Sequence, residues 1–179
     1  MESSFKNFLK RKREGKITLT NELKFSAKKP LLAIILEDRL KEEDEVKLRY
    51  ILEGIEAINT EVVVMCDEDC EFFEKMNHVQ IMRFNRINRR NLMEAADLAL
   101  CFEFNDVEEM LLHGIIPVSA ERPDLMDYDA NHETGYGFIY KNTGVWGVFA
   151  ALVRAVETFK FPYDWKHIMQ EGIRAVKEA

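Results

Sequence analysis

Short apolar segments of strand length alternate along this chain with segments whose apolar residues recur at helical spacing. The first of them, Leu31–Leu36, is apolar throughout, which is typical of a strand covered on both faces. The next segment, residues 43–58, is expected to be a helix with one apolar stripe made of Val46, Tyr50, Ile51, Ile55 and Ile58. This alternation predicts strands joined by crossover helices, and therefore a mostly parallel sheet with helices on both faces.

The alternation continues to the C-terminus. Further strands are expected over Glu61–Met65, Val79–Phe84, Leu98–Phe102, Ile115–Val118 and Gly137–Tyr140. Helices are expected over Glu71–Met76, Asn88–Ala96, Val107–Leu112, Val145–Phe159 and about Tyr163–Val176. We therefore predict an α/β fold with a doubly wound, mostly parallel sheet of about six strands.

Charge divides the chain into two regions. Residues 1–29 carry nine Lys or Arg against three Glu, whereas the whole chain of 179 residues has a formal net charge of −7. We predict a basic N-terminal helix and arm over residues 1–29, with a short helix that ends at Gly15, and an α/β domain over residues 30–179. Two basic clusters, Lys10–Arg13 and Arg83–Arg90, are interpreted as solvated helix surface, because charge runs usually are.

Composition excludes several classes of protein and partner. The acidic remainder of the chain argues against nucleic acid as the main partner, because phosphate binding requires a basic face. The longest apolar runs are far shorter than the ~20 residues of a membrane span, and the charged N-terminus lacks the apolar core of a secretory signal. Three cysteines are too few for a disulfide scaffold and favour a reducing setting. We expect a cytoplasmic protein without a membrane partner.

The loops that follow the strands are the candidate sites, because ligands of doubly wound sheets bind outside the carboxyl ends of the strands. The loop after the first strand, residues 37–44, reads EDRLKEED and contains no glycine. It matches neither the glycine-rich dinucleotide turn nor the phosphate loop, and its carboxylates would repel a pyrophosphate. NAD-dependent and P-loop chemistry are therefore not expected.

The cysteines and histidines form no pattern typical of a metal site or a nucleophile. Cys66 and Cys70 enclose three acidic residues, but no second Cys or His pair stands at zinc spacing, so we interpret the segment as an acidic helix start. The four histidines are scattered along the chain, and Cys101 lies within an apolar strand, where an inert core thiol is expected. No metal site is predicted.

Several motifs occur in the order that is typical of one enzyme family. They are AADLAL at 95–100, GIIPV at 114–118, TGYGF at 134–138, and Tyr163-Asp164-Trp165 with Gly172 near the end. From Phe5 to its C-terminus the chain resembles the C-terminal Rossmann-like domain of starch and glycogen synthases, which are glycosyltransferases of the two-domain GT-B fold. The resemblance implies a crevice for a sugar-nucleotide donor, which in the family faces a second domain that binds the acceptor glucan.

The donor-binding loops of that family differ in this chain. Where the family has an Arg and a Lys after the first strand, this chain has Glu37 and either Glu42 or Asp44. Arg39 is the basic candidate near the position of the family's Arg.

The loops after the fourth and fifth strands differ as well. Glu103 is the residue that corresponds best to the family's glutamate in contact with the donor sugar. The family's glycine turn, whose N–H groups cradle phosphate, is replaced by AERPD at residues 120–124, in which Pro123 has no N–H and Arg122 is the basic candidate. The resemblance therefore extends over the scaffold more than over the donor-binding loops.

We predict a glycogen/starch synthase-like chain that has no transfer activity on its own and acts by association. The expected partner is a separate chain with the missing N-terminal domain, or another protein, docked on the crevice side or through residues 1–29. In a first alternative the chain is the donor-binding half of a split synthase that uses ADP- or UDP-glucose, held by Arg39, Glu103 and Arg122. In a second alternative it binds another small molecule in the same crevice. No further cofactor is expected.

Overall fold

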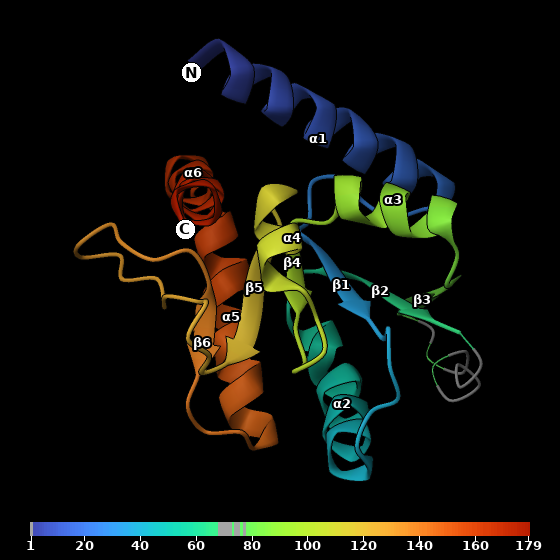
Figure 1. Ribbon diagram of the computed structural model, residues 1–179. Coiled ribbons are helices and arrows are strands. Elements are labelled where there is room, and N and C mark those ends of the chain that lie inside the picture. The colour runs from blue at the N-terminus through green and yellow to red at the C-terminus, as the bar shows by residue number, and fades with distance from the viewer. Residues whose placement is uncertain (1, 68–72, 74–75, 77) are drawn as a thin grey trace.

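The computed structural model describes residues 2–67, 73, 76 and 78–179, and six strands within them form one parallel sheet (Figure 1). The order of the strands is β3-β2-β1-β4-β5-β6. The strands are β1 (Leu31–Ile35), β2 (Glu61–Cys66), β3 (Val79–Arg83), β4 (Leu98–Leu100), β5 (Ile116–Ala120) and β6 (Phe138–Tyr140). The predicted doubly wound α/β sheet is confirmed, and its order reverses between β1 and β4, which defines the topological switch point.

Helices cover both faces of this sheet (Figure 1). They are α1 (Glu2–Glu22), α2 (Glu42–Gly54), the 3-10 turn η1 (Ile55–Ala57), α3 (Arg86–Ala95), α4 (Val107–Leu112), α5 (Val145–Phe159) and α6 (Pro162–Glu178). Side chains of α2, α5 and α6 pack on one face, and side chains of α3 and α4 pack on the other. Helix α1 contributes to both clusters, with Phe5 and Leu9 against the first and Leu19 in the second. The helix expected over Glu71–Met76 lies largely outside the described residues.

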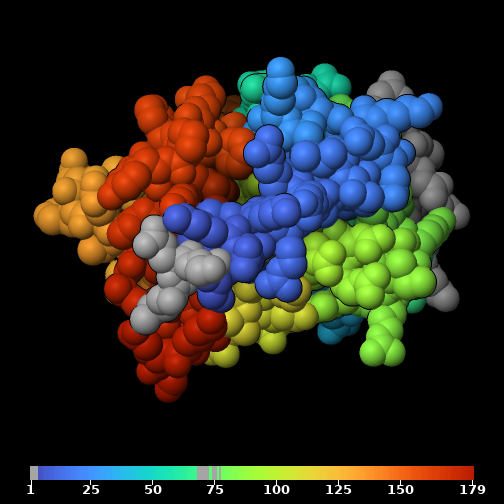
Figure 2. Space-filling view, turned by 90° about the horizontal axis from the view of Figure 1, so that it is seen from above, coloured from blue at the N-terminus to red at the C-terminus, as the bar shows by residue number. Residues whose placement is uncertain are grey.

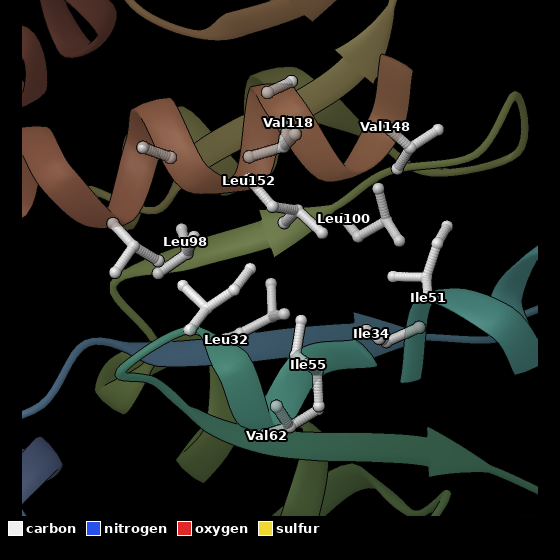
Figure 3. Close-up of a cluster of buried hydrophobic side chains, with 14 of the residues drawn as sticks. Leu32, Ile34, Ile51, Ile55, Val62, Leu98, Leu100, Val118, Val148 and Leu152 are labelled. Carbon is white, nitrogen blue, oxygen red and sulfur yellow. The ribbon is translucent and has the colours of Figure 1, made fainter. Parts of the chain in front are cut away.

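The apolar run of β1 follows from this two-sided burial. Leu32 and Ile34 point into the cluster beneath α2 and α5 (Figure 3), whereas Leu31, Ala33 and Ile35 belong to the cluster on the opposite face. All five residues are buried. A strand between two layers of helices needs apolar side chains at every position. This requirement explains why β1 could be predicted from its continuous apolar run.

The apolar stripe of α2 differs from the prediction. The buried residues of this segment are Leu48, Ile51, Leu52 and Ile55, whereas Val46 and Tyr50 are exposed. The apolar residues of this segment can be grouped at helical spacing into more than one stripe. The stripe that contains Leu48 and Leu52 is the one that packs on the sheet. The expectation that Val46 and Tyr50 face the core is therefore wrong.

The N-terminal helix also differs from the prediction, because Gly15 does not end it. Helix α1 continues to Glu22 and lies across one end of the molecule (Figure 2). At Gly15 it passes close to α3, where a Cβ atom on the glycine would lie 3.4 Å from the Cβ of Glu94. The glycine thus serves the close approach of two helices.

Two lysines of α1 reach the amino edge of the sheet. Lys12 Nζ donates hydrogen bonds to the backbone oxygens of Ala96 (2.6 Å) and His113 (2.9 Å). Lys12 is buried, so the interpretation of the cluster Lys10–Arg13 as solvated surface is wrong for this residue. Its exposed neighbours Arg11 and Arg13 agree with that interpretation.

Lys16 makes a second contact of this kind. Its Nζ lies 2.6 Å from a carboxylate oxygen of Asp97 and donates to the backbone oxygen of Lys29 at 2.7 Å. The same Asp97 oxygen accepts the N–H of Leu31 at 2.7 Å. Asp97, which belongs to the AADLAL motif, therefore joins β1, β4 and α1.

The buried Lys12 leads to a pH-dependent prediction. Burial lowers its pKa from 10.5 to about 8. Between these two values the unfolded chain binds the proton more tightly, so the contribution of Lys12 to the free energy of unfolding rises with pH. We expect the unfolding free energy of the wild type minus that of Lys12→Met, measured by urea denaturation, to rise between about pH 8 and pH 10. A difference that stays level or falls would contradict the buried position.

A second prediction concerns the two tryptophans. Trp165 is 5% exposed, and its ring centroid lies 5.2 Å from that of Phe159 and 6.4 Å from that of Phe138. We expect Trp165→Ala to lower the free energy of unfolding by about 3–5 kcal/mol, because it leaves a cavity in the core. The matched control is Trp146→Ala, at a side chain that is 82% exposed, with a change of about 0.5 kcal/mol or less. Equal losses in chemical denaturation would refute the assignment of Trp165 to the core.

Candidate functional site

A buried asparagine lies at the switch point, between the carboxyl ends of β1 and β4. The Asn105 amide donates to the backbone oxygen of Ile35, the last residue of β1, at 2.9 Å. Its Oδ1 accepts the N–H of Phe102 at 2.8 Å, and the residue is 2% exposed. Part of the region where ligands of doubly wound sheets bind is thus filled by a side chain of the protein.

An exposed ion pair joins the loops that follow β1 and β4. Lys41 Nζ lies 2.9 Å from a carboxylate oxygen of Glu103. The hydrogen bond between them, followed by their Coulomb attraction, raises the pKa of Lys41 and lowers the pKa of Glu103. Glu103, predicted to contact a donor sugar, therefore already has a cationic partner that was not predicted from the sequence.

A partly buried arginine of α3 bonds two carboxylates from different elements. The Arg89 guanidinium donates to Glu37 Oε1 from Nε (3.0 Å) and Nη2 (2.9 Å). It also donates to both carboxylate oxygens of Glu109 in α4, at 2.8 and 2.6 Å. These bonds hold the pKa of Glu109 below its usual range. Arg89 belongs to the cluster Arg83–Arg90, so the interpretation of that cluster as solvated surface is wrong at this position.

The arginine predicted in the loop after β5 is paired within its own loop. Arg122 donates from Nε and Nη2 to the two carboxylate oxygens of Asp124, at 2.6 and 2.8 Å. Its Nη1 donates to the backbone oxygen of Asn105 at 3.3 Å. The bidentate pair lowers the pKa of Asp124 and raises that of Arg122. The structure thus brings Arg122 against the loop that carries Glu103.

Arg39 differs from the other cations of this edge. It is exposed in the loop after β1, and its backbone N–H donates to Asp38 Oδ1 at 2.7 Å. No ion pair of its guanidinium occurs with any described residue. Among the described cations of the three loops, Arg39 is therefore the one best able to meet an external anion.

Three residues of this edge were not predicted from the sequence as part of the site: Lys41, Arg89 and Asn105. Asn105-Asp106 at a strand-to-helix turn was a usable signal for Asn105, because Asn and Asp often bond to nearby backbone groups at helix starts. Arg89 meets Glu37 and Glu109 only through the fold, since these partners are 52 and 20 residues away. A single sequence contains no pattern for such contacts.

Two further observations concern metal sites and membranes. In the described part of the chain, no group of three or more His, Cys, Asp or Glu residues is arranged to hold a metal ion. No helix there has the length and apolarity needed to cross a membrane. Residues 68–72, with Cys70 and its acidic neighbours, lie outside the described residues. Cys101 is buried, as predicted, and burial raises its pKa to about 12.

Two curated proteins are similar to this chain in sequence. Glycogen synthase 1 of Synechocystis sp. is 30% identical over 106 residues, which cover 54% of this chain and 22% of that protein. Glycogen synthase of Trichodesmium erythraeum is 23% identical over 189 residues, which cover 94% of this chain and 41% of that protein. The chain is glycogen/starch synthase-like. It spans less than half the length of these relatives, and no family model matches it.

Solved structures support the same relationship at the level of the fold. The glycogen/starch synthase-like chain superposes on the catalytic domain of starch synthase IV from Arabidopsis thaliana with a TM-score of 0.74 and 20% identity, over 90% of this chain and 38% of that one. A glycosyltransferase from Rickettsia africae gives a TM-score of 0.69 and 10% identity, over 92% of this chain and 47% of that one. The fold is that of one Rossmann-like half of a GT-B glycosyltransferase, as predicted.

Arg89 gives a testable prediction for this edge. Arg89→Gln leaves Glu37 and Glu109 without their shared cation, and we expect a loss of about 1–2 kcal/mol of unfolding free energy, since the group is partly exposed. Because the pKa of Glu109 is lowered in the folded chain, this contribution is present at neutral pH and disappears as the pH falls through that lowered value. Denaturant titrations at neutral and acidic pH measure the difference.

The control for this variant is Arg39→Gln, which removes an exposed guanidinium and should change stability by about 0.5 kcal/mol or less. If both variants lose the same stability, or if the loss at Arg89 is independent of pH, the Glu37–Arg89–Glu109 contacts do not contribute as described.

Proposed function

We propose that this glycogen/starch synthase-like chain does not transfer sugar on its own and acts by association with a partner protein. The observation that carries the proposal is that three cations of the carboxyl edge are bonded to carboxylates. Arg122 bonds to Asp124, and Lys41 to Glu103. Arg89 bonds to Glu37 and Glu109, so these charges are compensated within the chain.

The chemistry of glycosyl transfer explains why these ion pairs matter for function. When the bond between the anomeric carbon and the diphosphate oxygen breaks, negative charge develops on the leaving diphosphate. A catalyst stabilises that charge with preorganised cations and N–H donors. Here a diphosphate would have to displace carboxylates from Arg122 or Arg89, and the displaced carboxylates would remain close to the phosphates. Both effects weaken binding of the donor and of the transition state.

The proposed partner is a separate protein that carries a second Rossmann-like half, or another protein that docks on the carboxyl edge. The comparisons support a search for the former, because this chain covers 22% and 41% of its two curated relatives. Docking through residues 1–29 would have to use their exposed side chains, since Lys12 and Lys16 are already bonded at the amino edge.

A second candidate function is the donor-binding half of a split synthase that uses ADP- or UDP-glucose. Arg39 favours it, because this exposed guanidinium has no ion-pair partner among the described residues and follows β1 at the switch point. In this alternative Arg39 contacts the diphosphate, and Glu103 contacts the sugar after release from Lys41.

Calorimetric titration with ADP, UDP, ADP-glucose and UDP-glucose separates the two functions. We expect dissociation constants of about 1 mM or weaker for all four nucleotides. A much tighter constant for any of them would support the donor-binding half. Arg39→Ala should then weaken binding tenfold or more, since hydrogen bonds to charged groups contribute roughly 1.5–3 kcal/mol. Arg13→Ala, an exposed site on α1 at the opposite edge, is the matched control and should leave binding unchanged.

A further inference from the structure

Exposed apolar side chains occur at both edges of the sheet, and the charges around them have opposite signs. The carboxyl edge carries Val46 and Tyr50 of α2 and Trp146 of α5, which we call the Trp146 patch. Trp146 is 82% exposed and Tyr50 is 60% exposed. Aromatic side chains of this kind are enriched among the residues that dominate protein interfaces.

The packing of α2 against α5 places these rings on one surface. Phe149 of α5 packs on Gly54 of α2, where an added Cβ would lie 3.2 Å from the Phe149 ring. Tyr50 precedes Gly54 by four residues, and Trp146 precedes Phe149 by three, so each ring lies one turn further toward the carboxyl edge. Trp146 also meets Phe149 edge-on, with a centroid distance of 6.4 Å. Tyr50 and Trp146 thus extend from the contact between α2 and α5 toward the carboxyl edge.

Acidic residues predominate at the edge that carries the Trp146 patch. The first turn of α2 contains Glu42, Glu43, Asp44 and Glu45, of which Asp44 pairs with Lys47 and Glu45 with Arg49. Further exposed carboxylates of the same edge are Asp38, Asp106, Glu108 and Glu121. They outnumber the exposed cations of these loops, which are Arg39, Lys41 and Lys141. The edge as a whole is therefore negatively charged.

The opposite edge carries the complementary features. Lys10, Arg13 and Ile17 are exposed and follow one another at helical spacing on α1. Phe161 and Tyr163, at the start of α6, are exposed as well. The end of α5 lies close to α1, since Lys16 is placed over the Phe159 ring at 4.8 Å. We call these five exposed side chains the α1 patch: Lys10, Arg13, Ile17, Phe161 and Tyr163.

We propose that the chain associates head to tail with further copies of itself, with the α1 patch of one copy bound to the Trp146 patch of the next. Figure 1 shows α1 at one end of the molecule and the first turns of α2 and α5 at the other. A contact between two different patches leaves one free patch on each outer copy, so it builds open chains or closed rings. This inference does not depend on the proposed function.

Charge complementarity favours a second copy over the other occupants of the Trp146 patch. Both partners of the contact are present on this chain. Lys10 lies 4.0 Å from Glu14, but residues 1–29 carry nine Lys or Arg against three Glu, so this side is basic overall and matches the acidic carboxyl edge. An uncharged glucan could stack on the rings of Tyr50 and Trp146 and hydrogen-bond to nearby carboxylates, but it would gain no net Coulomb attraction from them. Self-association should therefore weaken with salt, because the Debye length falls from about 30 Å at 0.01 M to about 3 Å at 1 M.

Sedimentation velocity of the full chain measures the association directly. At about 0.01 M salt we expect the mean mass of the wild type to rise with protein concentration, and at about 1 M salt we expect this rise to be suppressed. Trp146→Ala should weaken the association about tenfold or more, as removal of an interface anchor does. Circular dichroism verifies that the variants are folded, which their exposed positions favour.

A mixing experiment distinguishes a head-to-tail contact from a symmetric one. Tyr50→Ala/Trp146→Ala retains only an intact α1 patch, and Lys10→Glu/Arg13→Glu retains only an intact Trp146 patch. Each variant alone should be monomeric, whereas an equimolar mixture should form a dimer that grows no further.

Three outcomes would overturn the proposal. They are a wild type that stays monomeric at low salt, a mixture that stays monomeric while the wild type associates, and variants that associate as the wild type does. If the wild type is monomeric and binds maltooligosaccharide in a Trp146-dependent manner, the patch is a glucan site and self-association is excluded as its role.

Discussion

The two ends of β1 are held by buried polar side chains that flank β4. Asp97 accepts the N–H of Leu31 at one end, and Asn105 donates to the backbone oxygen of Ile35 at the other. Buried backbone groups must be bonded, and the terminal groups of a central strand find no partner within the ladder. The pairing of β1 with β4 at the switch point is therefore fixed by these two side chains as well as by the sheet itself.

Each of these residues also determines a feature beyond β1. Asp97 binds Lys16, so the residue that fixes the start of β1 also holds α1 on the amino edge. Asn105 fills part of the switch point, and its backbone oxygen accepts a hydrogen bond from Arg122. The same Arg122 also pairs with Asp124. The fold is that of one Rossmann-like half of a GT-B glycosyltransferase, and the loops after β1, β4 and β5 are bonded to one another.

Whether a feature could be predicted from the sequence depends on how far apart in the sequence the interacting residues lie. The parallel sheet was predictable because burial on both faces makes β1 apolar at all five positions. Gly15 was misread as a helix end. A glycine fits at this position because α1 passes close to Glu94 of α3, a residue that is far away in the sequence. Tyr50 was misread because two apolar stripes on α2 were compatible with helical spacing.

The candidate site was predictable in place but not in its bonds. The loops after β1, β4 and β5 were the expected location, and Arg39, Glu103 and Arg122 lie there. Their charge balance depends on partners such as Lys41 and Asp124, whose orientation follows from the folded loops. The negative composition of this edge was visible in the sequence, whereas the pairing of Lys41, Arg89 and Arg122 with carboxylates required the structure.

The most direct measurement concerns the carboxylates that bind Arg89 and Arg122. In the combined variant Glu37→Gln, Glu109→Gln and Asp124→Asn both guanidinium groups lose their anionic partners while the side-chain shapes are retained. If these carboxylates keep a diphosphate away, the variant should bind ADP at least about tenfold more tightly than the wild type in calorimetry, since a hydrogen bond to a charged group contributes roughly 1.5–3 kcal/mol. Equal ADP affinity in the two proteins, or tight binding by the wild type, would contradict this explanation.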